Sequence, residues 1–261
     1  MTEQLHILYY ICVMKIAQIT DLHIDLNGEF PLNIDVRKNF LDILELAVKE
    51  SPDYLVVTGD ICYDVPIEEL YVWVRAQLDQ LPFPYEIIAG NHDDSVMMAE
   101  AFELEHFLKD GEFYFSKKIG RKHCLFLDSS KGAHSDNQLK WLKRQLKSNT
   151  EDIVIFMHHP PFKAGIPFMD QKHALKDMEA IQPIFLNYPH NITVFCGHYH
   201  IEKTIVYKNV TLMISPSCFF QMSQNSSEFS VDHHRIGLRM IYTDGGLLSS
   251  TVRYLDGNSV V

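Results

Sequence analysis

Six short, β-rich apolar runs separated by amphipathic segments are the feature that most limits what this chain can fold into. Each run is short enough for one buried strand. The segments between them carry apolar residues at helical spacing, and Pro66 and Ser135 stand where the second and third helices would begin. The expected strands are 15–20, 54–58, 85–89, 123–128, 152–157 and 192–196, and the expected helices are 35–50, 66–81 and 135–147. Strand and helix in alternation predict an α/β fold with a buried sheet.

The C-terminal part of the chain has a different pattern. Residues 235–255 read as two strands around an Asp-Gly-Gly turn, which predicts a β-hairpin. No repeat, low-complexity tract or linker divides the chain, so we predict one domain over residues 14–261. Met14 opens the first strand, and we interpret residues 1–13 as an N-terminal extension.

Composition excludes several classes of protein. The 261 residues are 46% hydrophobic, enough for a sizeable core. A formal charge of -11 argues against binding to a nucleic acid polymer. The five scattered cysteines form no C-x-x-C pair, which is typical of a reducing cytoplasm. Residues 5–14 are apolar but too short to cross a bilayer, and no signal-peptide pattern surrounds them, so we expect no membrane association.

Five of the six expected strands run directly into side chains that can bind metals. These side chains are Asp21 and His23, then Asp60, then Asn91, His92 and Asp93, then His158 and His159, and finally His198 and His200. The carboxyl ends of strands in α/β sheets meet at one edge, where ligands bind. In the D-x-H and H-x-H pairs, alternate side chains project the same way if the chain is extended. The pattern therefore predicts a metal site at this edge.

Each of these motifs also has an ordinary structural interpretation. A D-x-H pair is common by chance, Gly-Asp forms turns, and Asn or Asp can cap backbone groups. A single buried histidine is more often a hydrogen-bonded core residue than a ligand, and we expect such a role for six of the eight histidines outside the motifs, namely His6, His106, His123, His190, His233 and His234. The coincidence of five motifs at the ends of five of the six expected strands favours the metal site.

The ordered motifs resemble those of the calcineurin-like metallophosphoesterases. The set is D-x-H at 21–23, G-D at 59–60, G-N-H-D at 90–93, H-H-P-P at 158–161 and G-H-x-H at 197–200. Within that superfamily the chain is most similar to the class III cyclic-nucleotide phosphodiesterases, in the segments 135–142, 158–171 and 214–222 and in the final hairpin. The resemblance implies a four-layer α-β-β-α sandwich with two mixed β-sheets.

The resemblance also implies two metal ions at the strand ends. Asp21, His23 and His200 would bind the first ion, Asn91, His158 and His198 the second, and Asp60 would bridge both. Imidazole, carboxylate and amide ligands without a thiolate favour iron or manganese, with zinc as an alternative. Water that bridges two ions becomes acidic enough to attack a phosphodiester as hydroxide.

Two histidines outside the ligand set are candidates for the chemistry. His92 follows the ligand Asn91 and would give a proton to the leaving alkoxide, while Asp93 would orient His92 or cap the next helix. His159 would either contact substrate or support the site through a hydrogen bond.

The resemblance implies that the substrate is a small phosphodiester, namely 3′,5′-cyclic AMP or GMP. A broad-specificity phosphodiesterase, a glycerophosphodiesterase and a phosphomonoesterase are alternatives, because the same metal ligands serve all of them. Phe168 and Phe219 would stack on a base or pack in the core. A binding scaffold that retains the fold is the non-enzymatic alternative, and it has no physical need for seven ligands. Oligomeric state has no signal in the sequence.

Overall fold

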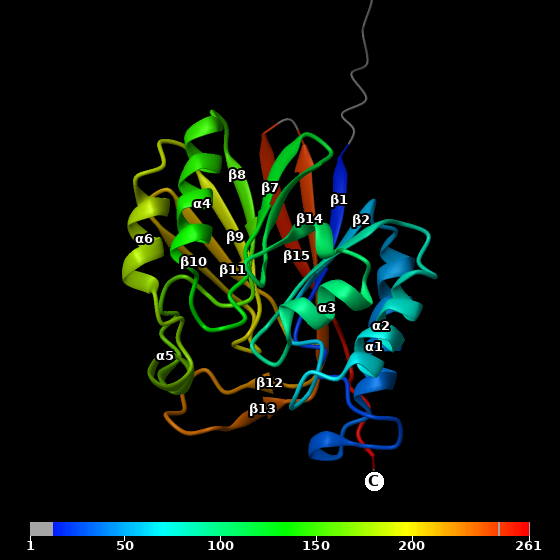
Figure 1. The fold of residues 1–261 in the computed structure, drawn as a ribbon. Helices are drawn as coiled ribbons and strands as arrows, with labels where there is room; N and C mark the ends of the chain where they lie inside the picture. Colours follow the sequence, from blue (N-terminus) through cyan, green and yellow to red (C-terminus); the bar gives the residue numbers. More distant parts are fainter. Residues whose placement is uncertain (1–12, 245, 261) are drawn as a thin grey trace, which may run out of the picture.

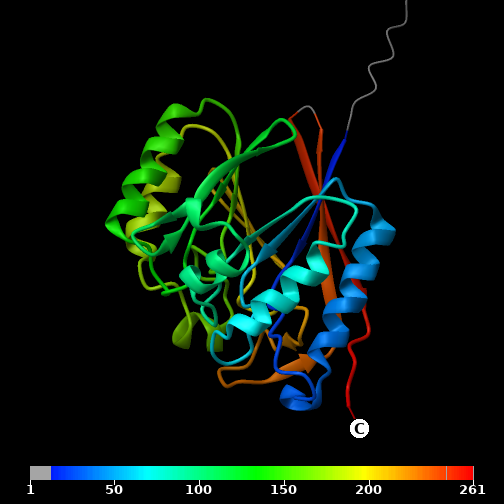
Figure 2. The same ribbon diagram turned by 45° about the vertical axis from the view of Figure 1, so that its right-hand side comes forward.

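The computed structural model describes residues 13–244 and 246–260, and it shows four layers (Figure 1). Two β-sheets pack face to face, with α1 (Val36–Glu50) and α2 (Glu68–Leu78) outside one sheet and α4 (Asp136–Ser148) and α6 (Met178–Leu186) outside the other (Figures 1 and 2). This arrangement confirms the predicted α-β-β-α sandwich. Residues 1–12 of the predicted extension lie outside the described residues, so the boundary at Met14 stays a prediction.

The first sheet has five strands in the order β15-β14-β1-β2-β3. Their bounds are β15 Leu247–Leu255, β14 Ile236–Asp244, β1 Met14–Ile19, β2 Tyr54–Thr58 and β3 Tyr85–Ile88. The three N-terminal strands are parallel, and β14 pairs antiparallel with both β1 and β15. The predicted C-terminal hairpin is therefore confirmed as β14–β15, and it makes this sheet mixed.

The second sheet has six strands in the order β10-β11-β9-β8-β7-β6. Their bounds are β10 Lys203–Tyr207, β11 Val210–Ile214, β9 Ile192–Cys196, β8 Ile153–Phe156, β7 Lys122–Phe126 and β6 Phe115–Ile119. The four central strands are parallel, and the two edge strands are antiparallel to their neighbours. The phenylalanines of successive strands stack with ring centroids 4.4, 5.2 and 5.5 Å apart, namely Phe115, Phe126, Phe156 and Phe195. These rings share one core cluster with strands of the first sheet, which joins the two sheets.

The three predicted helices form within a few residues of their expected bounds. The Asp35 carboxylate caps α1 by accepting the N–H of Lys38, and Ser51 ends the helix in the left-handed conformation. Ser135 caps α4 by accepting the N–H of Gln138. Helix α2 is shorter than predicted at both ends: its N-cap Ile67 is extended, and the helix ends at Leu78.

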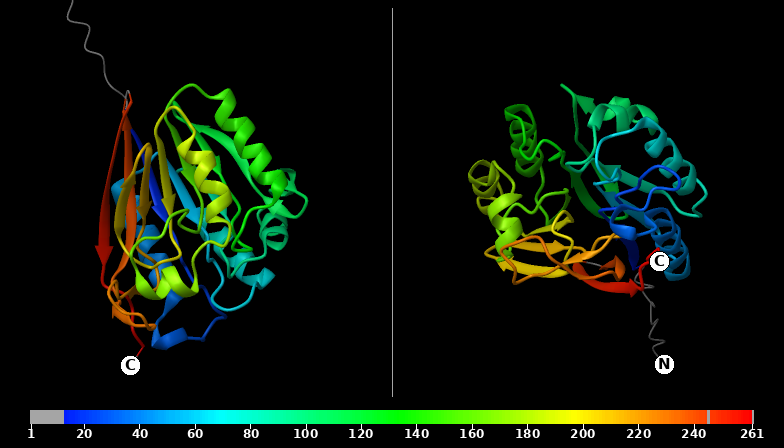
Figure 3. Two further views of the ribbon diagram at one scale, coloured as in Figure 1. Left: turned by 90° about the vertical axis from the view of Figure 1, so that its left-hand side faces the viewer. Right: turned by 90° about the horizontal axis from the view of Figure 1, so that it is seen from below.

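Shorter elements gather at the end of the sandwich where the parallel strands terminate, the lower end in Figure 1. They include α3 (Ser95–Ala101), α5 (Pro167–Lys172), β12 (Gln221–Met222) and β13 (Val231–His233), with the small pair β4 (Leu108–Lys109) and β5 (Glu112–Phe113) beside α3. The left view of Figure 3 shows α5 and the β12–β13 pair at this same end. We call this end the carboxyl edge. Among the described residues, no helix is both long enough and apolar enough to span a membrane.

Candidate metal centre

The loops at the carboxyl edge hold an unusual backbone conformation. Five of the seven predicted ligands have positive φ angles: Asp21 (54°), His23 (49°), Asp60 (51°), His198 (67°) and His200 (49°). Residues other than glycine rarely adopt this backbone conformation, and those that do are concentrated at functional sites. The backbone therefore orients these side chains toward one place, at the expense of the local stability of each turn.

Glycines allow these loops to approach one another closely. A Cβ atom on Gly90 would lie 2.2 Å from both the backbone nitrogen and a carboxylate oxygen of Asp60. A Cβ atom on Gly197 would lie 2.0 Å from the Thr20 hydroxyl and 2.4 Å from a carboxylate oxygen of Asp21. Only residues without a Cβ fit at these two positions, which is the physical reason for Gly in the G-N-H-D and G-H-x-H motifs.

The side chains that follow the five strands converge. Three groups have potential ligand atoms within 4.8 Å of one another: Asp21, His23 and His200; His23, Asp60 and His92; and Asp60, His158 and His198. The Oδ1 atom of Asn91 lies 3.2 Å from Nε2 of His158 and so joins the third group. The structure thus brings all seven predicted ligands together. That they bind metal in the predicted division stays a proposal.

Asp60 lies between the two halves of this cluster. Its Oδ2 atom is 3.1 Å from Nε2 of His158 and 3.7 Å from Nε2 of His23. On the side of His23, Nε2 of His200 lies 3.1 Å from Nε2 of His23 and 3.3 Å from Oδ1 of Asp21. One carboxylate therefore faces both predicted sites, as a bridging ligand must.

Backbone carbonyl groups orient three of the histidines. Nδ1 of His158 lies 2.8 Å from the carbonyl oxygen of Thr58, and Nδ1 of His200 lies 3.2 Å from that of Phe220. Nε2 of His198 lies 2.9 Å from the carbonyl oxygen of His173. A nitrogen beside a carbonyl must carry the proton, so the other ring nitrogen keeps its lone pair for a metal.

Burial and charge set the protonation of the cluster. Burial lowers the pKa of His23 and that of His198 to about 3 in each case, so both rings are neutral at neutral pH. Burial also disfavours the charged form of His158, but the charge and hydrogen bond of Asp60 outweigh it and raise the pKa of His158 to about 9. The pKa of Asp60 falls well below its usual range because His158 overcomes the effect of burial. A metal cation would take the place of the proton that this pair shares.

These residues fit two metal ions. The cluster offers imidazole nitrogens, carboxylate oxygens and one amide oxygen, and within the described chain no cysteine belongs to any of the three groups. Ligands that each lie about 2.0–2.2 Å from one ion stand about 3 Å apart. The 3.1 Å separation of the His23 and His200 Nε2 atoms matches that spacing. Without an ion, a proton on one of these two nitrogens would join them in a hydrogen bond, and a cation would take the place of that proton.

His92 borders the cluster. Its ring makes an edge contact with the ring of His23, with centroids 5.0 Å apart, and its backbone N–H donates to Oδ1 of Asp60 at 3.0 Å. Its side chain is half-buried and therefore open to a substrate. This position suits a proton donor beside the predicted ions.

Asp93 has a role that the sequence did not reveal. Its carboxylate accepts the N–H groups of Ile61, Cys62 and Gly90 at 2.8 to 3.1 Å and the Tyr71 hydroxyl at 3.2 Å. None of the hydrogen bonds in the described chain joins it to the His92 ring, and Asp94 is the residue that caps α3. Asp93 therefore ties the Asp60 loop to the Asn91 loop.

The three residues predicted to contact substrate differ in how deeply they are buried. His159 is buried, its Nδ1 lies 2.9 Å from the Ser129 hydroxyl, and its ring lies 4.1 Å from that of His198. Phe219 is 2% exposed and packs 5.3 Å from the His23 ring, so it forms the wall behind that ligand. Phe168 is half-buried on α5, with its ring 5.1 Å from His173. Substrate contact by these three residues stays a prediction.

The sequence interpretation missed a group of lysines beside the centre. Lys131, Lys172 and Lys176 line a cavity together with Asn91, His159 and His198. One signal was available for Lys131, because it follows the fourth apolar run, 123–128, whose carboxyl end lies at the same edge. Lys172 lies at the end of α5 and Lys176 follows that helix, and no periodic pattern in the sequence predicted α5.

Comparison with known proteins agrees with this geometry. The profile of the family described as Calcineurin-like phosphoesterase matches residues 14–202. The chain is similar to a probable cyclic nucleotide phosphodiesterase of Fibrobacter succinogenes, with 32% identity over 83% of this chain and 84% of the relative. It is similar to a probable glycerophosphodiester phosphodiesterase, GpdQ, of Arcobacter nitrofigilis, with 26% identity over 91% of this chain and 92% of the relative. Among solved structures, a dimetal phosphatase from Danio rerio shares the fold, with a TM-score of 0.65, 12% identity, and coverage of 95% of this chain and 99% of the other.

Proposed function

The chain belongs to the calcineurin-like phosphoesterase family of metal-dependent phosphoric ester hydrolases, and from that premise we propose that it hydrolyses small phosphodiesters, with 3′,5′-cyclic nucleotides as the first substrates. The observation that carries the proposal is the convergence of all seven predicted ligands at the carboxyl edge. A scaffold without catalysis would not need five strained backbone positions around one cluster.

The residues divide into two ligand sets. Asp21, His23 and His200 would hold one ion, Asn91, His158 and His198 the other, and Asp60 both. When bound, the ions would supply the positive charge that neutralises a phosphate and makes a water molecule acidic. Iron or manganese suits this donor set, with zinc as the alternative.

The protein's own groups prepare the site for that chemistry. The carbonyl oxygens of Thr58, Phe220 and His173 hold the ligand rings in one tautomer, and Asp93 fixes the spacing of two ligand loops. His92 would donate a proton to the oxygen that leaves phosphorus, because it is the half-buried histidine that borders the predicted first site. Such preorganisation means that little rearrangement is needed when substrate arrives.

Two kinds of phosphodiester are candidate substrates. The similarity to a probable cyclic nucleotide phosphodiesterase supports cyclic AMP or GMP. The similarity to a probable glycerophosphodiester phosphodiesterase over nearly the whole chain supports glycerophosphodiesters as the second candidate. A panel of cyclic AMP, cyclic GMP, glycerophosphocholine and a phosphomonoester, assayed with Mn and with Fe, ranks them by kcat/KM.

Metal removal tests the proposal directly. A strong chelator followed by desalting is expected to abolish phosphodiesterase activity, and added Mn, Fe or Zn is expected to restore it, because the seven side chains include no group that could replace the cations. The measurement is the rate before chelation, after it and after each metal is added. Full activity in metal-free protein would contradict the mechanism, and tight binding of two ions with no activity on any ester would favour a scaffold.

The proton-donor role of His92 predicts a difference between substrates. His92→Ala is expected to slow cyclic AMP hydrolysis by about 10²–10⁴-fold, because a ribose alkoxide needs a proton as it leaves. Hydrolysis of bis(4-nitrophenyl) phosphate is expected to slow much less, since nitrophenolate is stable without one. Metal content, measured in parallel, should not change. An equal loss on both substrates would mean that His92 orients phosphate instead.

A further inference from the structure

A cavity of about 310 Å³ opens beside the metal centre. It touches Asn91 and His198 of the second predicted ligand set, and His159 behind them. None of Asp21, His23, Asp60 and His200 is among its lining residues. Its other side is formed by Ser130, Lys131, Gly132, Lys172, His173, Ala174 and Lys176. We call this cavity the basic pocket.

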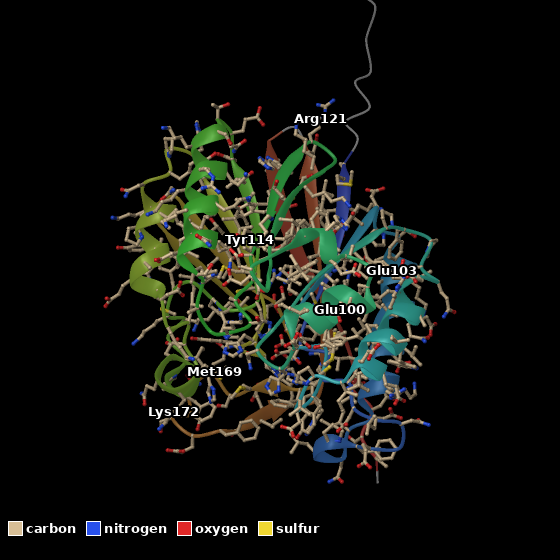
Figure 4. All side chains as sticks on the ribbon, in the orientation of Figure 1. Glu100, Glu103, Tyr114, Arg121, Met169 and Lys172 are labelled. Carbon is tan, nitrogen blue, oxygen red and sulfur yellow. The ribbon has the colours of Figure 1, made fainter. Side chains whose placement is uncertain are left out.

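Two of the three lysines of the basic pocket come from loops that are hydrogen-bonded to each other. Lys131 and Gly132 follow β7, and Lys176 lies between α5 and α6. The N–H of Lys176 donates to the carbonyl oxygen of Gly132 at 2.8 Å. Gly132 has a φ of 71°, and a Cβ atom there would lie 3.3 Å from Cε of Lys176, so the lysine stem passes over the glycine. Lys172 ends α5 at the outer rim, where Figure 4 labels it near Met169.

In the part of the chain that the structure describes, the three ammonium groups have no anionic partner. Across residues 13–244 and 246–260, no carboxylate lies within 4.0 Å of Lys131, Lys172 or Lys176. Carboxylates near these loops are bonded to other donors: Asp128 to Ser95, Asp170 to Tyr199, and Asp177 to His134. Three unpaired cations around one cavity are notable in a chain whose net charge is -11. Their positive potential would attract an anion.

The scissile phosphate alone does not account for this pocket. A phosphate that is attacked between two ions must lie against both ligand sets, whereas the basic pocket touches only the second set. It therefore extends away from the reacting phosphorus, to the place where the remainder of a substrate would lie. Its volume is at the lower end of the range for small-molecule sites.

We propose that the basic pocket binds a second anionic group, a phosphate or carboxylate carried by the part of the substrate that is not cleaved. This inference rests on the proposed phosphodiesterase function and adds to its substrate class a preference for diesters with an additional negative charge. A cyclic mononucleotide would react but would leave the lysines without a partner. Phosphorylated nucleotide diesters would use both the metal centre and the pocket.

Two diesters with the same leaving group test this inference. Thymidine 5′-(4-nitrophenyl phosphate) has one phosphate. Its 3′-phosphorylated form has a second phosphate, which takes no part in the cleavage reaction. With metal-loaded protein we expect kcat/KM to be about tenfold higher for the 3′-phosphorylated diester, a value set by several exposed charge pairs. Lys172→Ala combined with Lys176→Ala should remove most of that preference, and the two Lys→Arg changes should retain it.

Matched controls separate a local site from a general effect of charge. Lys143→Ala with Lys147→Ala removes two exposed lysines from α4, outside the basic pocket, and should leave the preference unchanged. If the Lys172 and Lys176 variants slow both diesters by the same factor, the lysines act on the scissile phosphate and the inference fails. Equal kcat/KM for the two diesters in the unchanged protein would also overturn it.

Binding keeps the inference testable if neither diester is cleaved. Calorimetry with metal-loaded protein would compare thymidine 3′,5′-bisphosphate with thymidine 5′-phosphate. Tighter binding of the bisphosphate that depends on Lys172 and Lys176 would support the pocket even though the proposed function had failed. Equal binding of the two would overturn the inference by itself.

Discussion

Asp60→Ala is expected to lose both metal ions and to reduce phosphodiesterase activity by more than about 10²-fold. Loss of a group that only supports a metal ligand typically costs 10- to 100-fold, and Asp60 faces both halves of the cluster directly, at 3.1 Å from His158 and 3.7 Å from His23. Its removal also leaves His158 buried without its counter-charge. The measurement is metal content per chain together with kcat/KM.

Two variants serve as controls for Asp60. His200 belongs to one ligand set only, so His200→Ala should lower the occupancy of chiefly one metal site. Asp64→Ala removes an exposed carboxylate from the same loop and should keep both ions and full activity. If Asp60→Ala protein retains two tightly bound ions, Asp60 is not the bridge.

Gly90→Ala is expected to destabilise the fold and the metal centre together. The added methyl would lie 2.2 Å from the backbone nitrogen of Asp60, and a backbone atom cannot move aside as the end of a flexible side chain can. Overpacking of this kind costs about 1–3 kcal/mol. Because the strain pushes the Asp60 and Asn91 loops apart, we expect metal content and kcat to fall as well. Urea unfolding, metal content and kcat measure the three effects.

Gly28→Ala is the matched control for this change. Gly28 has a φ of 91° but nothing lies within 4 Å of the position of its missing Cβ. The variant should lose about 1 kcal/mol to backbone strain and keep its metals and activity. If Gly28→Ala and Gly90→Ala lose the same stability and Gly90→Ala keeps full activity, the metal centre does not require the close approach of the Asp60 and Asn91 loops.

The strands and helices could be predicted because their signals are local. Runs such as 54–58 and 192–196 appear in the structure with the same bounds, since a short β-rich run fits a buried strand almost regardless of its neighbours. The edge strand β6 was missed because three exposed polar residues separate its two buried ends, and the edge strand β10 was missed although it is β-rich; none of its residues is buried. Helix α5 has only six residues, too few for a periodic pattern.

The amino-acid sequence by itself determined that Asp, Asn and His side chains follow five strands, and parallel strands bring their carboxyl ends to one edge for topological reasons. Which nitrogen of each ring faces the centre was decided only by the tertiary structure, because the carbonyl groups of Thr58, His173 and Phe220 lie far from their histidines along the chain. The same holds for the Asp93 carboxylate, which bonds loops about 30 residues apart. The basic pocket likewise depends on tertiary contacts, because its lining residues come from separate segments such as the Gly132 loop and the Lys176 loop. Periodicity and motif spacing act along the chain, whereas tautomers, loop spacing and cavities depend on contacts between distant segments.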